Sequence, residues 1–269
     1  MARANLGSRR SCEIIISEGR VTVDGRVAKL GDKADPTRQR IEVDGRPLFA
    51  ESAGAANAGL IYIALNKPRG VISSLEDEME EGRTTVRDLI DIEGEHHIYP
   101  VGRLDKPSEG LVLMTNDGAL AHRLTHPRYG HEKVYDVTVD GNISERALDQ
   151  WRRGIILDGR ITAPAPIEVV ERSPDSTRLR IILREGRKRQ IRRIAAALGH
   201  PVRRLIRERI GPLALGDLPS GQWRYLTERE VNELKQSVLT APASSGQGIK
   251  NKPSRQAQHP NSKRETRAA

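Results

Sequence analysis

The sequence is poor in cysteine and has no long apolar run. Cys12 is its single cysteine, so the chain cannot form an internal disulfide. No apolar stretch approaches the roughly 20 residues that a membrane-spanning helix needs, and the first residues lack the apolar core of a signal peptide. Glycine-rich dinucleotide and phosphate-binding signatures are also missing. These absences exclude a disulfide-stabilised secreted scaffold and favour a soluble, cytoplasmic protein.

Positive charge is what the chain has in excess. Its 269 residues include 45 Lys and Arg against 36 Asp and Glu, which gives a formal net charge of +9. Such a balance favours a polyanionic partner, and we expect a nucleic acid because no segment suits a membrane. On charge alone, a basic globular protein without such a partner is the alternative.

Composition divides the chain into four parts. We expect a compact module at 1–48, a small-residue linker at 49–59, the main domain at 60–240 and a disordered basic tail at 241–269. The tail carries six Lys and Arg and one Glu, so it supplies +5 of the net +9. It could add non-specific RNA affinity or simply keep the protein soluble.

The first module shows helix and hairpin signals. A helix carrying Ile14 to Ile16 should end at Gly19, and Asp24-Gly25 should form the turn of a hairpin. A third strand is expected at 40–45. Basic residues, among them Arg9 and Arg10, surround the helix, and they fit either an RNA-binding face or a solvated one.

The main domain mixes strands with helices. We expect strands near 60–67, 133–140 and 177–184. We also expect a helix at 118–126, capped by Asn116 or Asp117, and a helix at 144–153, capped by Ser144 and stopped by Gly154. Hairpin turns as well as helices join the strands, so the fold class is α+β: a mixed, largely antiparallel central sheet flanked by helices, preceded by the small α/β module.

The densest charge lies at 184–209, which holds ten Lys and Arg and two Glu. Within it a helix with one apolar stripe should end at Gly199. At about 100° per residue, Arg192 flanks that stripe and can lean over the sheet edge, whereas Arg189 and Arg193 should face solvent or phosphate.

The most informative stretch is VGRLDKPSEGLVLMTNDG, residues 101–118. Asp105 lies between two apolar runs, beside Arg103, in a context that suits either a surface turn or a functional carboxylate. Three further segments are distinctive: NKPRGVISS at 66–74, EKVYDV at 132–137 and EGRKRQIRRIAAALGHPVRRLIR at 185–207. Together they resemble the pseudouridine synthases of the ribosomal small-subunit type, the family that includes RsuA and RluB. Residues 1–48 resemble an S4 RNA-binding domain.

This resemblance implies an enzyme that isomerises a uridine of ribosomal RNA. The N1–C1′ bond breaks, the uracil rotates, and the base is rejoined through C5 without a cofactor or a metal. Asp105 is implied as the carboxylate that acts at the ribose, Arg192 as the cation that pairs with it, and Tyr135 as the ring that stacks on the uracil.

RNA contacts are implied for a further set of residues: Arg103, Lys133, Arg187, Lys188 and Gln190, with Arg9 and Arg10 of the first module. The run at 209–227 resembles large-subunit enzymes more closely, which favours 23S over 16S rRNA. A non-catalytic ribosome-assembly factor that binds RNA is the alternative, and we expect a monomer.

Three histidines offer a competing interpretation as a metal site. His122 and His126 are four residues apart in an expected helix, and His131 is near, which is a spacing that metal ligands use. However, no Glu follows His122 as in a zinc-protease helix, and Pro127 marks a helix end. We therefore do not expect a metal.

Overall fold

The computed structural model describes residues 9–36, 38–48, 59–75, 81–92 and 98–240, together with Met1 and Leu6. The expected linker at 49–59 (Gly59 excepted) and the expected tail at 241–269 lie outside these residues, as do the side chains of Arg9 and Arg10.

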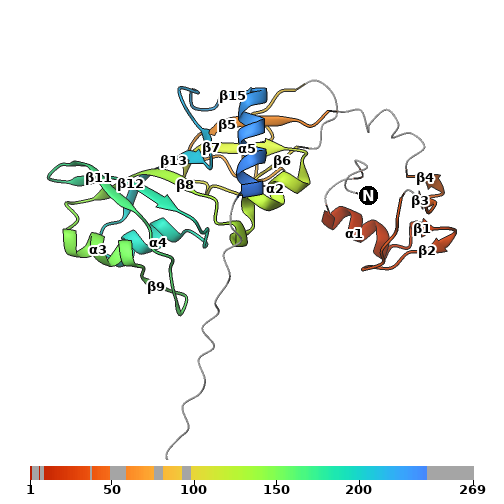
Figure 1. The fold of residues 1–269 in the computed structure, drawn as a ribbon, viewed down its shortest axis with the longest axis horizontal. Coiled ribbons are helices and arrows are strands. Elements are labelled where there is room, and N and C mark those ends of the chain that lie inside the picture. Colours follow the sequence, from red (N-terminus) through yellow and green to blue (C-terminus); the bar gives the residue numbers. More distant parts are fainter. Residues whose placement is uncertain are drawn as a thin grey trace, which may run out of the picture.

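The described residues of the first module form one helix and a small sheet (Figure 1). Helix α1 spans Arg9–Ser17, and the four strands follow the order β2-β1-β3-β4. Their bounds are β1 Val21–Val23, β2 Arg26–Val27, β3 Ile41–Val43 and β4 Arg46–Pro47. Asp24 and Gly25 have φ angles of 50° and 78°, the backbone that a two-residue hairpin of type I′ requires. The expected helix, hairpin and third strand are confirmed.

A nine-stranded sheet forms the centre of the main domain, in the order β11-β12-β8-β13-β7-β5-β15, with β14 beside β13 and β6 beside β7. Only β7 and β13 pair in parallel, and every other pairing of its described strands is antiparallel. The predicted mixed, largely antiparallel sheet is confirmed. The strand bounds are β5 Tyr62–Lys67, β6 Tyr99–Pro100, β7 Glu109–Thr115, β8 Lys133–Asp140, β11 Ile167–Arg172, β12 Ser176–Leu183, β13 Val202–Ile210, β14 Leu213–Ala214 and β15 Trp223–Tyr225.

Helices cover both faces of this sheet (Figure 1). Helices α3 (Glu145–Arg153) and α4 (Gln190–Ala197) contribute to one core cluster, and α2 (Gly118–Thr125) and α5 (Glu228–Thr240) to the other. Strand β7 is buried on both sides, because Val112 and Met114 enter the first cluster while Leu111 and Leu113 enter the second. That double burial explains its unbroken apolar run.

Local signals placed the helix ends correctly. The Asp117 side chain accepts hydrogen bonds from the first turn of α2, and Ser144 caps α3, which stops at Gly154. Outside the main sheet, β9 (Ile156–Leu157) and β10 (Arg160–Ile161) form a separate hairpin, and a short 3-10 helix, η2 (Pro127–Tyr129), follows α2.

Candidate active site

Asp105 lies in the short loop between β6 and β7. Its side chain is half-buried, whereas Arg103 and Lys106 on either side are exposed. A carboxylate that is partly desolvated yet open to one side can meet a ligand while the protein holds it in place.

The backbone of this loop is fixed by an unusually complete set of hydrogen bonds. Five successive carbonyl oxygens each accept one. The donors come from segment 67–73, from α4 and from the loop itself: Ser73 Oγ to Leu104 (3.0 Å), Ser108 N–H to Asp105 (2.9 Å), Gly70 N–H to Lys106 (2.8 Å), Arg192 Nη2 to Pro107 (2.8 Å) and Lys67 Nζ to Ser108 (2.7 Å). Two of the donors are cationic side chains, whose hydrogen bonds are stronger than neutral ones. The position of Asp105 is therefore set before any ligand binds.

Arg192 contacts the loop rather than the carboxylate. Its Nη2 donates to Ser108 Oγ at 3.0 Å as well as to Pro107, and its Nη1 lies 3.4 Å from the carbonyl oxygen of Val202. The expected ion pair with Asp105 is not formed between these two described residues. Burial lowers the pKa of Arg192, and the charge of Asp105 acts in the opposite direction. Arg192 thus holds the loop and lies within electrostatic range of Asp105.

A row of residues crosses four adjacent strands beside the loop. Tyr135 of β8 lies opposite Arg207 of β13, Arg207 opposite Gly110 of β7, and Gly110 opposite Lys67 of β5. With strands about 4.8 Å apart, the row spans about 14 Å of sheet. Tyr135 is only 9% exposed and belongs to the core cluster beneath α3 and α4. Its ring is therefore at the wall of the site and not on an open surface.

Gly110 is required by the close approach of β13. A Cβ atom at this position would lie 2.5 Å from the carbonyl oxygen of Arg207 and 2.6 Å from its nitrogen, and the φ angle of Gly110 is +102°. Side chains do not tolerate such contacts with backbone atoms, so only glycine fits. Gly110 thus joins the Asp105 loop to the parallel pair of β7 and β13.

Lys67 is a site residue that sequence reasoning missed. Its side chain is fully buried, and Nζ donates to the carbonyl oxygens of Ser108 (2.7 Å) and Pro68 (2.9 Å). Burial lowers its pKa to about 8, against the opposing charges of Glu109 and Asp105. A signal was present: Lys67 follows Ile63 and Leu65 on the inward face of β5, where a charge needs a reason.

The residues expected to bind RNA have different surroundings. Arg103 and Lys188 are exposed, while Lys133 is half-buried and its Nζ donates to the carbonyl oxygen of His131 at 3.0 Å. Gln190 is 4% exposed, and its side chain donates to Glu185 and accepts from the backbone of Arg187.

Arg187 secures the β9–β10 hairpin. Its guanidinium donates to three carbonyl oxygens there, those of Leu157, Arg160 and Ile161, at 3.2, 2.9 and 2.6 Å. Arg193, expected to face solvent or phosphate, instead pairs with Asp158 between the two strands at 2.6 Å. Both arginines therefore contribute to structure, whatever else they contact.

His122, His126 and His131 do not come together as metal ligands. His122 and His126 lie at the end of α2 with ring centroids 5.2 Å apart, and His131 is buried two residues before β8. Among the described residues, no group of three or more His, Cys, Asp or Glu side chains is placed to hold a metal. In the same part of the chain, no helix is long and apolar enough to cross a membrane.

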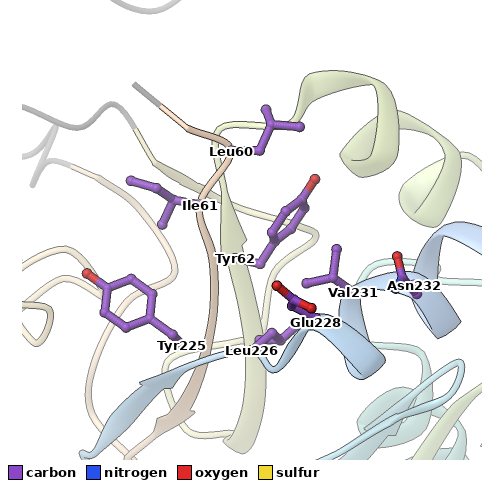
Figure 2. A pocket seen from close by; sticks show the side chains of 8 residues that line it. All are labelled: Leu60, Ile61, Tyr62, Tyr225, Leu226, Glu228, Val231 and Asn232. Carbon is purple, nitrogen blue, oxygen red and sulfur yellow. The ribbon is translucent and has the colours of Figure 1, made fainter. Parts of the chain in front are cut away.

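A pocket of about 360 Å³ lies away from Asp105, between β5, β15 and the start of α5 (Figure 2). It is lined by Leu60, Ile61, Tyr62, Tyr225, Leu226, Glu228, Val231 and Asn232. None of these side chains belongs to the Asp105 loop or to the row across the sheet. Glu228 is its one carboxylate, with no cation or second acid beside it in the lining, so the pocket offers no catalytic pair.

Comparison with known proteins agrees with this arrangement. The family described as RNA pseudouridylate synthase matches residues 61–197. An uncharacterized RNA pseudouridine synthase of Aquifex aeolicus is 40% identical over 240 residues, covering 88% of this chain and 92% of the relative. The ribosomal large subunit pseudouridine synthase B of Bacillus subtilis is 39% identical over 238 residues, with coverages of 87% and 93%. A crystal structure of a pseudouridylate synthase superimposes with a TM-score of 0.62 at 30% identity, covering 84% of this chain and 94% of its own. The chain therefore belongs to the family of RNA pseudouridylate synthases, enzymes that isomerise uridine in RNA.

Proposed function

We propose that this enzyme acts on a uridine of the large-subunit ribosomal RNA, 23S, and that Asp105 is its catalytic carboxylate. The observation that carries the assignment is the Asp105 loop, in which every carbonyl from Leu104 to Ser108 is hydrogen-bonded. A loop fixed to this degree presents one acidic side chain in a constant position, which is the preorganisation that catalysis uses. The relative from Bacillus subtilis, named as a large-subunit enzyme, supports the choice of RNA.

The chemistry assigns one role to each residue of the site. Asp105 acts at the ribose as nucleophile or base while the N1–C1′ bond breaks. Tyr135 holds the flipped uracil by stacking, which is worth about 1–3 kcal/mol per base and offsets much of the few kcal/mol that flipping costs. Arg192 keeps the loop and the charge of Asp105 in place through Ser108 and Pro107.

The test is conversion of 23S and 16S rRNA transcripts by the purified protein, with every pseudouridine mapped. Asp105→Asn keeps the shape of the side chain and removes its charge, so we expect no product, near-normal RNA affinity and an unchanged melting temperature. Asp217→Asn makes the same change at an exposed turn and should convert like the wild type. Product formed by the Asp105→Asn variant would disprove the catalytic assignment, and conversion of 16S alone would disprove the target.

We further propose that residues 1–48 are an S4-like domain that adds RNA affinity, while 60–240 carry out the reaction. A helix beside a small sheet, with basic residues at the helix start, supports this division. Replacing Arg9 and Arg10 with alanine should weaken rRNA binding and flatten its dependence on salt, because fewer phosphates are neutralised. Conversion at saturating enzyme should stay unchanged. An unaltered affinity and salt slope would refute the proposal.

A further inference from the structure

A cluster of basic side chains lies beside Tyr135 without a carboxylate to balance it. The cluster, which we call the basic cluster, consists of His131, Lys133 and Arg207. Lys133 Nζ donates to the carbonyl oxygen of His131 at 3.0 Å, and Arg207 Nε donates to the carbonyl oxygen of Leu111 at 2.8 Å. Two of its nitrogens, His131 Nε2 and Arg207 Nη2, are buried and have no hydrogen-bond partner among the described residues.

Unbalanced buried charge is costly, so it requires an explanation. Arg207 is 2% exposed and Lys133 half-buried, yet neither forms an ion pair within the described part of the chain. Burial and then the charge of Arg207 lower the pKa of Lys133 to about 8, which leaves it mostly charged at pH 7. Desolvating cations without a partner costs several kcal/mol, and such groups concentrate at functional sites.

The surrounding residues do not neutralise the cluster. Across the neighbouring strands, Lys133 lies opposite Leu183 and Ile210, which are both apolar. Glu132, the adjacent acid, pairs with Arg184 at 2.7 Å instead. Burial and the charge of Lys133 also lower the pKa of His131. The fold thus retains a net positive site two residues from Tyr135, on the same face of β8.

The reaction itself supplies an anion of the right kind. When the N1–C1′ bond breaks, its electron pair stays with the uracil, whose negative charge spreads over N1 and the carbonyl oxygens. C5 then bonds to C1′, the C5 proton leaves, and N1 takes up a proton. The base is therefore anionic only between the two bond changes, while it lies against Tyr135.

We propose that Lys133 is a catalytic residue that donates a hydrogen bond to the detached uracil anion and stabilises its charge, while the charge of Arg207 adds to the positive potential at this site. The inference rests on the proposed function and deepens it. Lys133 neither gains nor loses a proton in this role. A purely structural lysine would account for the contact with the His131 carbonyl, but it leaves the unpartnered nitrogens of Arg207 and His131 unexplained.

The test compares Lys133→Met, Lys133→Arg and Lys235→Met in single-turnover conversion of rRNA at saturating enzyme and pH 7. Removing one donor to a developing anion typically costs about 100- to 1,000-fold in rate, so we expect a loss of that size for Lys133→Met. Lys133→Arg keeps the charge and should retain most of the rate. Lys235→Met removes the same charge from α5, remote from the basic cluster in sequence, and should match the wild type.

A second substrate separates anion stabilisation from a structural effect. RNA with 5-fluorouridine at the target position releases a more stable base anion, which needs less help from the protein. The rate loss of Lys133→Met should therefore be clearly smaller for cleavage of 5-fluorouridine than for uridine. The melting temperature of Lys133→Met should equal or exceed that of the wild type, because a partly buried, unpaired charge is removed. If it fails to fold, Lys133→Gln takes its place in the same comparison.

Each outcome decides the question. Lys133→Met converting uridine at the wild-type rate, or losing the same factor on both substrates, overturns the inference and leaves the proposed function intact. A wild-type protein that forms no pseudouridine in any rRNA overturns the proposed function, and the role of Lys133 falls with it.

Discussion

Replacing Gly110 with alanine should destabilise the protein by about 4 kcal/mol. Two contributions add. The φ angle of +102° is unfavourable for alanine and costs about 2 kcal/mol. The new Cβ would lie 2.5 and 2.6 Å from the carbonyl oxygen and nitrogen of Arg207, and forcing backbone atoms apart costs about 2 kcal/mol more. For a domain of this size the sum corresponds to a melting temperature lower by about 8–16 °C.

Thermal unfolding followed by circular dichroism measures this effect. Gly186→Ala is the matched control, because no atom lies within 4 Å of its Cβ position and its φ is not positive. That variant should stay within about 0.5 kcal/mol of the wild type. Below its melting temperature, Gly110→Ala should also convert RNA slowly, since β7 must move away from β13 and take the Asp105 loop with it. Equal melting temperatures for the two variants would show that the strand pair tolerates a side chain and that our reading of Gly110 is wrong.

Three further predictions concern single side chains. Ser108→Ala removes one hydrogen-bond acceptor of Arg192 and should lower the free energy of unfolding by about 1 kcal/mol. Single-turnover conversion should be slower at unchanged RNA affinity. An unaltered rate would mean that the Pro107 carbonyl alone positions Arg192. Tyr135→Phe should keep RNA affinity and slow product formation, whereas Tyr135→Ala should weaken binding by about 1–3 kcal/mol; wild-type rates in both would make Tyr135 a core residue only. The hydrogen bond from Arg224 lowers the pKa of Glu230 from 4.5 to about 2. The ionised carboxylate therefore contributes its full stabilisation above pH 4.5, and this contribution is lost as the pH falls toward 2. Melting temperatures of Glu230→Gln between pH 2 and 6 should show a weaker acid dependence than the wild type, and an identical dependence would contradict the assignment.

The sequence predicted those structural features that depend only on residues close together in the chain, such as helix caps and hairpin turns. Ser144, and either Asn116 or Asp117, were recognisable as helix caps because a cap acts within three residues; the structure assigns the second cap to Asp117. Asp24-Gly25 was recognisable as a hairpin turn because such a turn needs positive φ angles, which these residue types tolerate. Separated motifs that agree in order predicted a pseudouridine synthase, and both this enzyme class and the broader family of RNA pseudouridylate synthases are confirmed.

The sequence did not predict which residues lie side by side in the site, because this depends on the register between strands that are distant in the chain. Nothing near Lys67 or Arg207 in the sequence indicates that Gly110 lies between them. Charge alone also cannot distinguish an arginine that holds a hairpin from one that binds phosphate, as Arg187 illustrates. The sequence predicted that Arg192 lies close to the Asp105 loop, but it predicted the wrong partner. Arg192 binds the Ser108 hydroxyl and the Pro107 carbonyl instead of the Asp105 carboxylate, and nothing in the sequence marks that hydroxyl or that carbonyl as its acceptor.

The parallel pairing of β7 with β13 also constrains when the enzyme can become active during synthesis. Residues 109 and 110 pair with residues 206 and 207, so almost a hundred residues separate the two partners along the chain. Such non-local pairing is slow to form compared with hairpins, and on the ribosome it must wait until β13 has left the exit tunnel. Arg192, which holds the loop, also arrives late. A nascent chain can thus form the antiparallel β5–β7 pair earlier, but it acquires a fixed Asp105 only when most of the domain has been made.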